Sequence, residues 1–66
     1  MRVRLNGEEV EVPRGATVGS LVDRAAPDRA RVAVERNRAI VPRAQYDRAE
    51  VAEGDEIEIV TLVGGG

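Results

Sequence analysis

The first twelve residues carry the strongest folding signal of the sequence, an alternation of charged and apolar side chains around Asn6-Gly7. Asn-Gly between two alternating runs is typical of a tight β-hairpin, because both residues accept the positive φ of a type I′ turn. A two-residue loop would place Val3 opposite Val10, whereas a four-residue loop would place Leu5 opposite Val10. Either register gives the hairpin one apolar face and one charged face.

A short helix is predicted after the break at Pro13 and Gly15. Apolar residues recur there at helical spacing over about ten residues, which is typical of an amphipathic helix: Val18, Leu21, Val22 and Ala25. Thr17 is the expected N-cap, and Ser20 is a poor partner for a capping box, so we expect a weak cap. Pro27 is expected to end the helix. A helix this short needs a sheet to pack on.

A second hairpin is predicted in the middle of the chain. Residues 31–36 form an expected strand with Val32 and Val34 inward, and Asn37-Arg38 is expected to turn the chain into a short return strand over 39–41.

One turn of tight helix is then predicted at 45–47. Tyr46 is the only aromatic residue, and we expect it to lie over the edge of the core with its hydroxyl in water. A turn at 53–55 leads into the last strand.

The last strand, "EIEIVTLV", has two different faces. Ile57, Ile59, Thr61 and Val63 share the expected inner face, and the other face begins with Glu56 and Glu58 and becomes apolar at Val60 and Leu62. Either a bulge or a helix covers Val60 and Leu62, or they are exposed and form a candidate docking patch beside the terminal glycines.

The order of elements predicts an α+β fold. A mixed sheet of about four to five strands, packed on one main helix and with the last strand beside the first, is the simplest closed arrangement. This is the β-grasp, or ubiquitin-like, fold. We expect residues 1–63 to form the domain and residues 64–66 to form a flexible C-terminal glycine tail.

Composition excludes several functions. The 66 residues include no Cys and no His, so disulfides and the usual metal ligand sets are ruled out, and we expect no bound cofactor or metal. Scattered charges and a near absence of aromatics argue against nucleic acid and membrane partners. No signal region follows Met1 and no run is long enough for a membrane span, which favours the cytoplasm.

The side chains also offer little for catalysis. Without His, Cys or Lys, the chain has no evident activated nucleophile or general base, so we expect no enzyme activity. All ten basic residues are arginine. Codon bias explains this, and a chain without lysine also has no side-chain amine to attack an activated acyl group on its own tail.

Four segments together resemble the ThiS family, the ubiquitin-like sulfur carriers of thiamine biosynthesis. They are "LNGEEVEV", "GATVGSLV", "VAVERNRAIVPRAQYD" and "EGDEIEIVTLVGGG", and the third is the most specific. The chain departs from the family in having three terminal glycines, where two after a varied residue are usual.

The resemblance implies a role for the C-terminus. Gly66 would be adenylated by a ubiquitin-activating-type adenylyltransferase (ThiF-like) that uses ATP and Mg²⁺. A cysteine desulfurase would supply the sulfur for a thiocarboxylate, which would be passed to a thiazole synthase (ThiG-like). Gly64 and Gly65 would pass into the partner's active site. A carrier for molybdopterin or cysteine synthesis, a ubiquitin-like protein modifier and an inert interaction domain remain alternatives.

Overall fold

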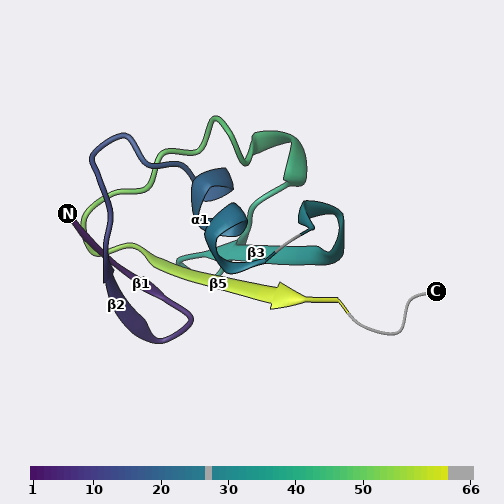
Figure 1. Cartoon of the computed structure of the whole chain (residues 1–66), viewed down its shortest axis with the longest axis horizontal. Coiled ribbons are helices and arrows are strands. Elements are labelled where there is room, and N and C mark those ends of the chain that lie inside the picture. The colour runs from purple at the N-terminus through teal and green to yellow at the C-terminus, as the bar shows by residue number, and fades with distance from the viewer. Residues whose placement is uncertain (27, 63–66) are drawn as a thin grey trace.

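The computed structural model describes residues 1–26 and 28–62. Within these residues, five strands form one mixed sheet in the order β2-β1-β5-β3-β4, and helix α1 covers one of its faces (Figure 1). The elements are β1 (Arg2–Leu5), β2 (Glu8–Glu11), α1 (Val18–Ala25), the 3-10 turn η1 (Arg29–Arg31), β3 (Val32–Arg36), β4 (Ala39–Ile40), the 3-10 turn η2 (Arg43–Gln45) and β5 (Glu56–Thr61).

The last strand is the centre of this sheet. β5 is parallel to β1 on one side and antiparallel to β3 on the other, as Figure 1 shows. The structure therefore confirms the β-grasp fold, including the placement of the last strand beside the first. Pro27, Val63 and the expected glycine tail at 64–66 lie outside the described residues.

The first hairpin has the two-residue loop. Val3 pairs with Val10 across β1 and β2, and the four-residue alternative is wrong. Asn6 has φ 51° and Gly7 has φ 85°, the left-handed conformation that a type I′ turn needs at both central positions.

Helix α1 starts with a stronger cap than the sequence suggested. The Thr17 hydroxyl accepts from the Ser20 N–H at 3.1 Å, and the Ser20 hydroxyl accepts from the Thr17 N–H at 3.1 Å. A complete capping box is present, because a serine hydroxyl at the third position is close enough to replace the usual Glu or Gln. The N–H groups of Val18 and Gly19 donate to carbonyls of the loop at 46–49, so the helix start is also tied to that loop.

The helix end differs from the prediction. The helix has eight residues, shorter than expected, and Ala26 just beyond it is buried while Ala25 is exposed. The extended backbone of Ala26, with φ −145° and ψ 144°, turns its side chain to the core.

An ion-pair cluster joins this end of the helix to the rest of the chain. Arg29 binds the Asp23 carboxylate through two nitrogens, both at 2.9 Å, and binds Asp47 at 2.9 Å. The hydrogen bonds from Arg29 hold the pKa of both Asp23 and Asp47 below the usual value. β3 begins at Val32, one residue later than predicted, because Arg31 belongs to the 3-10 turn that Asp28 caps.

Tyr46 was predicted at the edge of the core and is instead 2% exposed. The 3-10 turn lies at Arg43–Gln45, two residues before the predicted position, because Pro42 presets the backbone for the turn. Tyr46 then follows the turn, and its ring packs inside. The remaining large core side chains come from both hairpins and the residues that follow them, from the helix, from β5 and from the loop before it: Val3, Leu5, Val12, Val18, Leu21, Val22, Val32, Val34, Val41, Val51, Ile57 and Ile59.

A mild truncation in the central strand tests this packing. Ile57 is fully buried, so Ile57→Val removes one methylene from a filled site and should cost about 0.5–1.5 kcal/mol. In a domain of this size, each kcal/mol corresponds to a melting temperature about 4–8 °C lower. Thermal melts followed by circular dichroism measure the effect. Val60→Ala, on the exposed side of the same strand, is the control and should change the free energy of unfolding by about 0.5 kcal/mol or less. Equal losses in the two variants would contradict the assignment of the core face.

Candidate functional site

The C-terminal end of β5 is the candidate site, and two neighbouring strands fix its position. β3 pairs with β5 over five residues, from Val32 opposite Thr61 to Arg36 opposite Ile57. The pairing continues past the strand, because the Leu62 N–H donates to the Arg31 carbonyl at 2.6 Å. On the other side, the Asn6 N–H donates to the Ile57 carbonyl at 2.9 Å.

The turn residue Asn6 has a second role that sequence reasoning missed. β1 pairs with β5 only at Arg4–Leu5, opposite Glu56–Ile57. Beyond that point the Asn6 side-chain oxygen accepts from the Ile59 N–H at 2.8 Å. Asn6 therefore extends the ladder by one bond where the hairpin turns away. The sequence shows why Asn suits the turn, but not that its amide meets a residue 53 positions later.

The other end of β5 is fixed by a polar network around Asn37. Asn37 donates its backbone N–H to the Glu56 carbonyl at 2.8 Å, and its side-chain oxygen accepts from the Glu56 N–H at 3.0 Å. Its side-chain amide donates to the buried Asp55 carboxylate at 3.1 Å. Asn37 has φ 50°, so this turn also uses the left-handed conformation that Asn tolerates.

Asp55 is the acidic centre of this network. It accepts from the Ala52 N–H at 2.8 Å and pairs with the Arg36 guanidinium at 3.0 Å. Burial would raise the pKa of Asp55, but the Ala52 and Asn37 hydrogen bonds and the Arg36 charge together hold it below the usual value. The carboxylate therefore stays ionised and locks the turn before β5.

Val60 and Leu62 are exposed. Each has 53% of its surface open to solvent, while Ile57 and Ile59 on the opposite side of the strand are buried. The alternative in which a bulge or helix covers them is wrong for the described residues. Thr61, predicted on the inner face, is exposed because the strand runs past the end of the core. The predicted tail residues Gly64, Gly65 and Gly66 lie outside the described residues.

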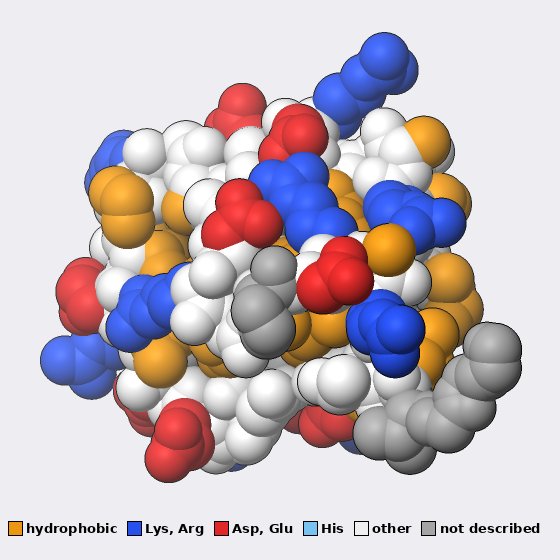
Figure 2. Space-filling view, turned by 45° about the vertical axis from the view of Figure 1, so that its right-hand side comes forward, with side chains coloured by type: hydrophobic (Ala, Val, Ile, Leu, Met, Phe, Trp, Pro, Cys, Tyr) orange, Lys and Arg blue, Asp and Glu red, His pale blue; other side chains and the backbone are white. Residues whose placement is uncertain are grey.

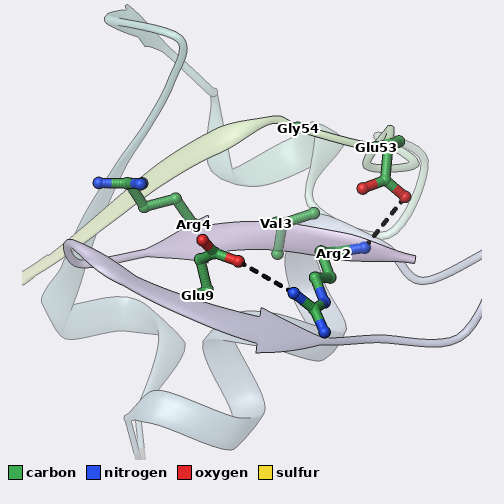
Figure 3. A pocket seen from close by; sticks show the side chains of 6 residues that line it. All are labelled: Arg2, Val3, Arg4, Glu9, Glu53 and Gly54. Carbon is green, nitrogen blue, oxygen red and sulfur yellow. Dashed lines mark hydrogen bonds and ion pairs between the residues drawn. The ribbon is translucent and has the colours of Figure 1, made fainter.

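The surface carries mixed charge. Figure 2 shows acidic and basic side chains interspersed on one face, with apolar groups between them. Figure 3 shows a shallow depression on the β1–β2 side, lined by Arg2, Val3, Arg4, Glu9, Glu53 and Gly54, where Glu9 pairs with Arg2.

Within the described residues, no group of three or more acidic side chains is arranged to hold a metal ion, and no helix has the length and apolarity to cross a membrane.

This fold places the protein in the ubiquitin-like β-grasp class. The last strand of the fold has an exposed apolar end. The chain matches the model of the ThiS family over residues 3–66. It belongs to the ThiS family.

Similar proteins fall into two kinds. The sulfur carrier protein ThiS of Bacillus subtilis is 35% identical over 65 residues, which cover 97% of this chain and 98% of that protein. A thiazole synthase of Paramagnetospirillum magneticum is 42% identical over 66 residues, but the chain spans only 20% of its length. A crystal structure of the thiamine biosynthesis protein ThiS from Geobacter metallireducens has a TM-score of 0.80 at 28% identity, with 100% of both chains covered.

The Asp55 network predicts acid sensitivity. The pKa of Asp55 is lower in the folded chain, so its stabilisation is present above the unfolded value of about 3.9 and is lost as the pH falls through the folded value. Asp55→Asn should lower the free energy of unfolding by about 1.5–3 kcal/mol at neutral pH, the range for hydrogen bonds to charged groups. The variant and the parent should converge as the pH falls through the folded pKa of Asp55.

Urea unfolding across this pH range measures the difference. Glu50→Gln is the matched control, since Glu50 is an exposed carboxylate on a neighbouring segment. A gap between Asp55→Asn and the parent that stays constant down to the lowest pH would contradict the role of the ionised carboxylate.

Proposed function

We propose that this chain is a sulfur carrier of thiamine biosynthesis, and that its C-terminal Gly66 is converted to a thiocarboxylate. The observation that carries the proposal is the family match over residues 3–66. It is supported by similarity over nearly the whole length of a relative named sulfur carrier protein ThiS. The exposed end of β5, which leads toward the glycines, fits this role.

The chemistry explains why the carrier needs a partner. A terminal carboxylate is ionised at neutral pH and is a poor electrophile. A ThiF-like adenylyltransferase with ATP and Mg²⁺ would join Gly66 to AMP and release pyrophosphate. The terminal sulfur of a persulfide, supplied through a cysteine desulfurase, would attack the acyl carbon and displace AMP. A thiol would then attack the resulting acyl disulfide, leaving the thiocarboxylate and a new disulfide.

Glycine suits this task because it has no Cβ. Gly64 and Gly65 would enter a narrow channel in backbone conformations closed to other residues, and nothing on Gly66 would crowd the acyl carbon. Four residues beyond Leu62 reach at most about 14 Å. A partner that acts on Gly66 must therefore approach the body closely, and Val60 and Leu62 are the proposed docking patch.

The carrier acts here as a substrate and not as an enzyme. We propose a ThiG-like thiazole synthase as the acceptor of the sulfur, because one similar protein is a thiazole synthase that contains a segment like this whole chain. The chain itself would bind no cofactor, and ATP and Mg²⁺ would be held by the activating partner. We propose the cytoplasm as the place of the reaction, where ATP is available.

Intact-mass analysis tests the proposal. The chain is incubated with its adenylating enzyme, ATP, Mg²⁺ and the desulfurase with cysteine. We expect the mass to rise by the replacement of one oxygen by sulfur. A chain that lacks both Gly65 and Gly66 should remain unmodified, because it no longer ends in the two glycines usual for the family. Its melting temperature should stay within about 2 °C of the parent, because terminal residues contribute little to a core.

The other outcomes separate the alternatives. Conjugates of higher mass would indicate a protein modifier, and an unchanged mass would indicate an inert interaction domain. A thiocarboxylate that a thiazole synthase does not accept would indicate a carrier for another pathway, such as molybdopterin or cysteine synthesis.

The docking patch makes a separate prediction. Replacing both residues, as Val60→Ser with Leu62→Ser, should raise the KM of the adenylating enzyme for the carrier about tenfold or more, since central apolar contacts carry much of an interface's energy. The turnover number should change little, because the tail is intact. Pyrophosphate-exchange kinetics measure both constants. Thr61→Ala, an exposed neighbour on the same strand, is the control. An unchanged KM in the double variant would contradict docking through this patch.

A further inference from the structure

We propose that the outer face of β3, β4 and β5 binds a partner surface that presents an arginine or lysine side chain between apolar groups, and that Glu35 and Glu58 receive this cation. The inference deepens the proposed function and rests on it, with the adenylating enzyme as the partner. Its basis is an unusual arrangement of side chains on that face of the sheet.

Two glutamates stand directly opposite each other there. Glu35 of β3 is the register partner of Glu58 of β5, and both are exposed. Residues opposite each other on one face have Cβ atoms about 4.5–5.5 Å apart, and like charges at that distance destabilise a sheet. No ion pair of either glutamate is present among the described residues.

On the other half of the same face, the glutamates lie beside arginines that balance their charge. Arg2 lies within 3.5 Å of Glu9 and 3.3 Å of Glu11, and Figure 3 shows the first of these pairs. Arg4 is the register partner of both Glu9 and Glu56. Charged side chains thus alternate in sign between β1 and β2, whereas two carboxylates lie next to each other between β3 and β5.

Apolar side chains surround this glutamate pair on two sides. Val60 and Ala33 are paired two residues further along the strands, and Ile40 of the edge strand is the register partner of Glu35. Ile40 is 68% exposed and Val60 is 53% exposed. A guanidinium or ammonium group on an aliphatic stem fits such a surface, because its stem covers apolar atoms while its head meets the carboxylates. Contact would also exclude water and strengthen the charge interaction.

The adenylating enzyme is the partner whose chemistry fits this surface. It must bind ATP and a terminal carboxylate, both anionic, so its site needs cationic groups. The short reach from Leu62 to Gly66, at most about 14 Å, brings the edge of that site close to β5. An anionic ligand would be repelled by the glutamates. A second copy of the chain docked through the same face in a two-fold dimer would bring four carboxylates together.

The experiment compares two charge-neutralising changes on one face of the sheet. The first variant carries Glu35→Gln with Glu58→Gln, and Glu9→Gln is the control, where the removed charge lies on β2 beside Arg2. Affinity for the adenylating enzyme is measured by titration calorimetry over a series of salt concentrations. Thermal melts and sedimentation of the carrier alone accompany it.

We expect opposite effects on binding and stability. The double variant should bind about tenfold more weakly, with a flatter dependence of affinity on salt, because a complementary charge contact is lost. Its melting temperature should rise by a few degrees, because the repulsion is relieved. Glu9→Gln should leave both affinity and salt dependence nearly unchanged.

Several results would overturn the inference. If the double variant has the affinity and salt dependence of the parent, the inference is wrong. The proposed function stands in that case if the parent is still adenylated at Gly66. A parent dimer that the double substitution alters would assign the face to a second copy. A parent that neither binds the enzyme nor is adenylated would overturn both the inference and the function it rests on.

Discussion

Pairing of the last strand on both sides is the constraint on which the rest of this structure depends. β5 joins two hairpins that would otherwise have no contact through the backbone, with β1 on one side and β3 on the other. A 66-residue chain without disulfides has a small core, so satisfied backbone groups are a large part of what makes its fold unique. Two asparagine side chains, Asn6 and Asn37, complete the pairing where the neighbouring strands turn away.

The same strand separates stability from recognition. Its inner side chains, Ile57 and Ile59, pack under α1, and the alternation of a β-strand sends Val60 and Glu58 to the opposite face. Residues on that face are nearly free of packing constraints, so they can serve a partner. The backbone of the strand is paired up to Leu62, the last described residue. A rigid strand end is a suitable base for the short tail that we propose enters a partner's site.

Local signals in the sequence were sufficient for most of the fold. The Asn6-Gly7 turn, the period-two strands and the apolar stripe of α1 predicted the elements. The last strand was placed beside the first because that gives the simplest closed arrangement. The errors arose where distant residues meet. Tyr46 was predicted at the edge of the core because nothing near it in sequence shows that the loop at 46–49 folds over the helix start. The Arg29 cluster and the Asp55 network also join segments far apart in the chain. The exposed face of β5 was predicted as one of two alternatives, since alternation alone does not tell what covers it.

Transfer of labelled sulfur is the most direct test of the central claim. The carrier is loaded with radioactive sulfur by its activating enzymes, purified, and mixed with a thiazole synthase and the other thiazole precursors for a single turnover. The account predicts that the label appears in the thiazole product and that the carrier returns to its carboxylate mass. Label that stays on the carrier, or thiazole formed equally well when the carrier lacks both Gly65 and Gly66, would contradict it.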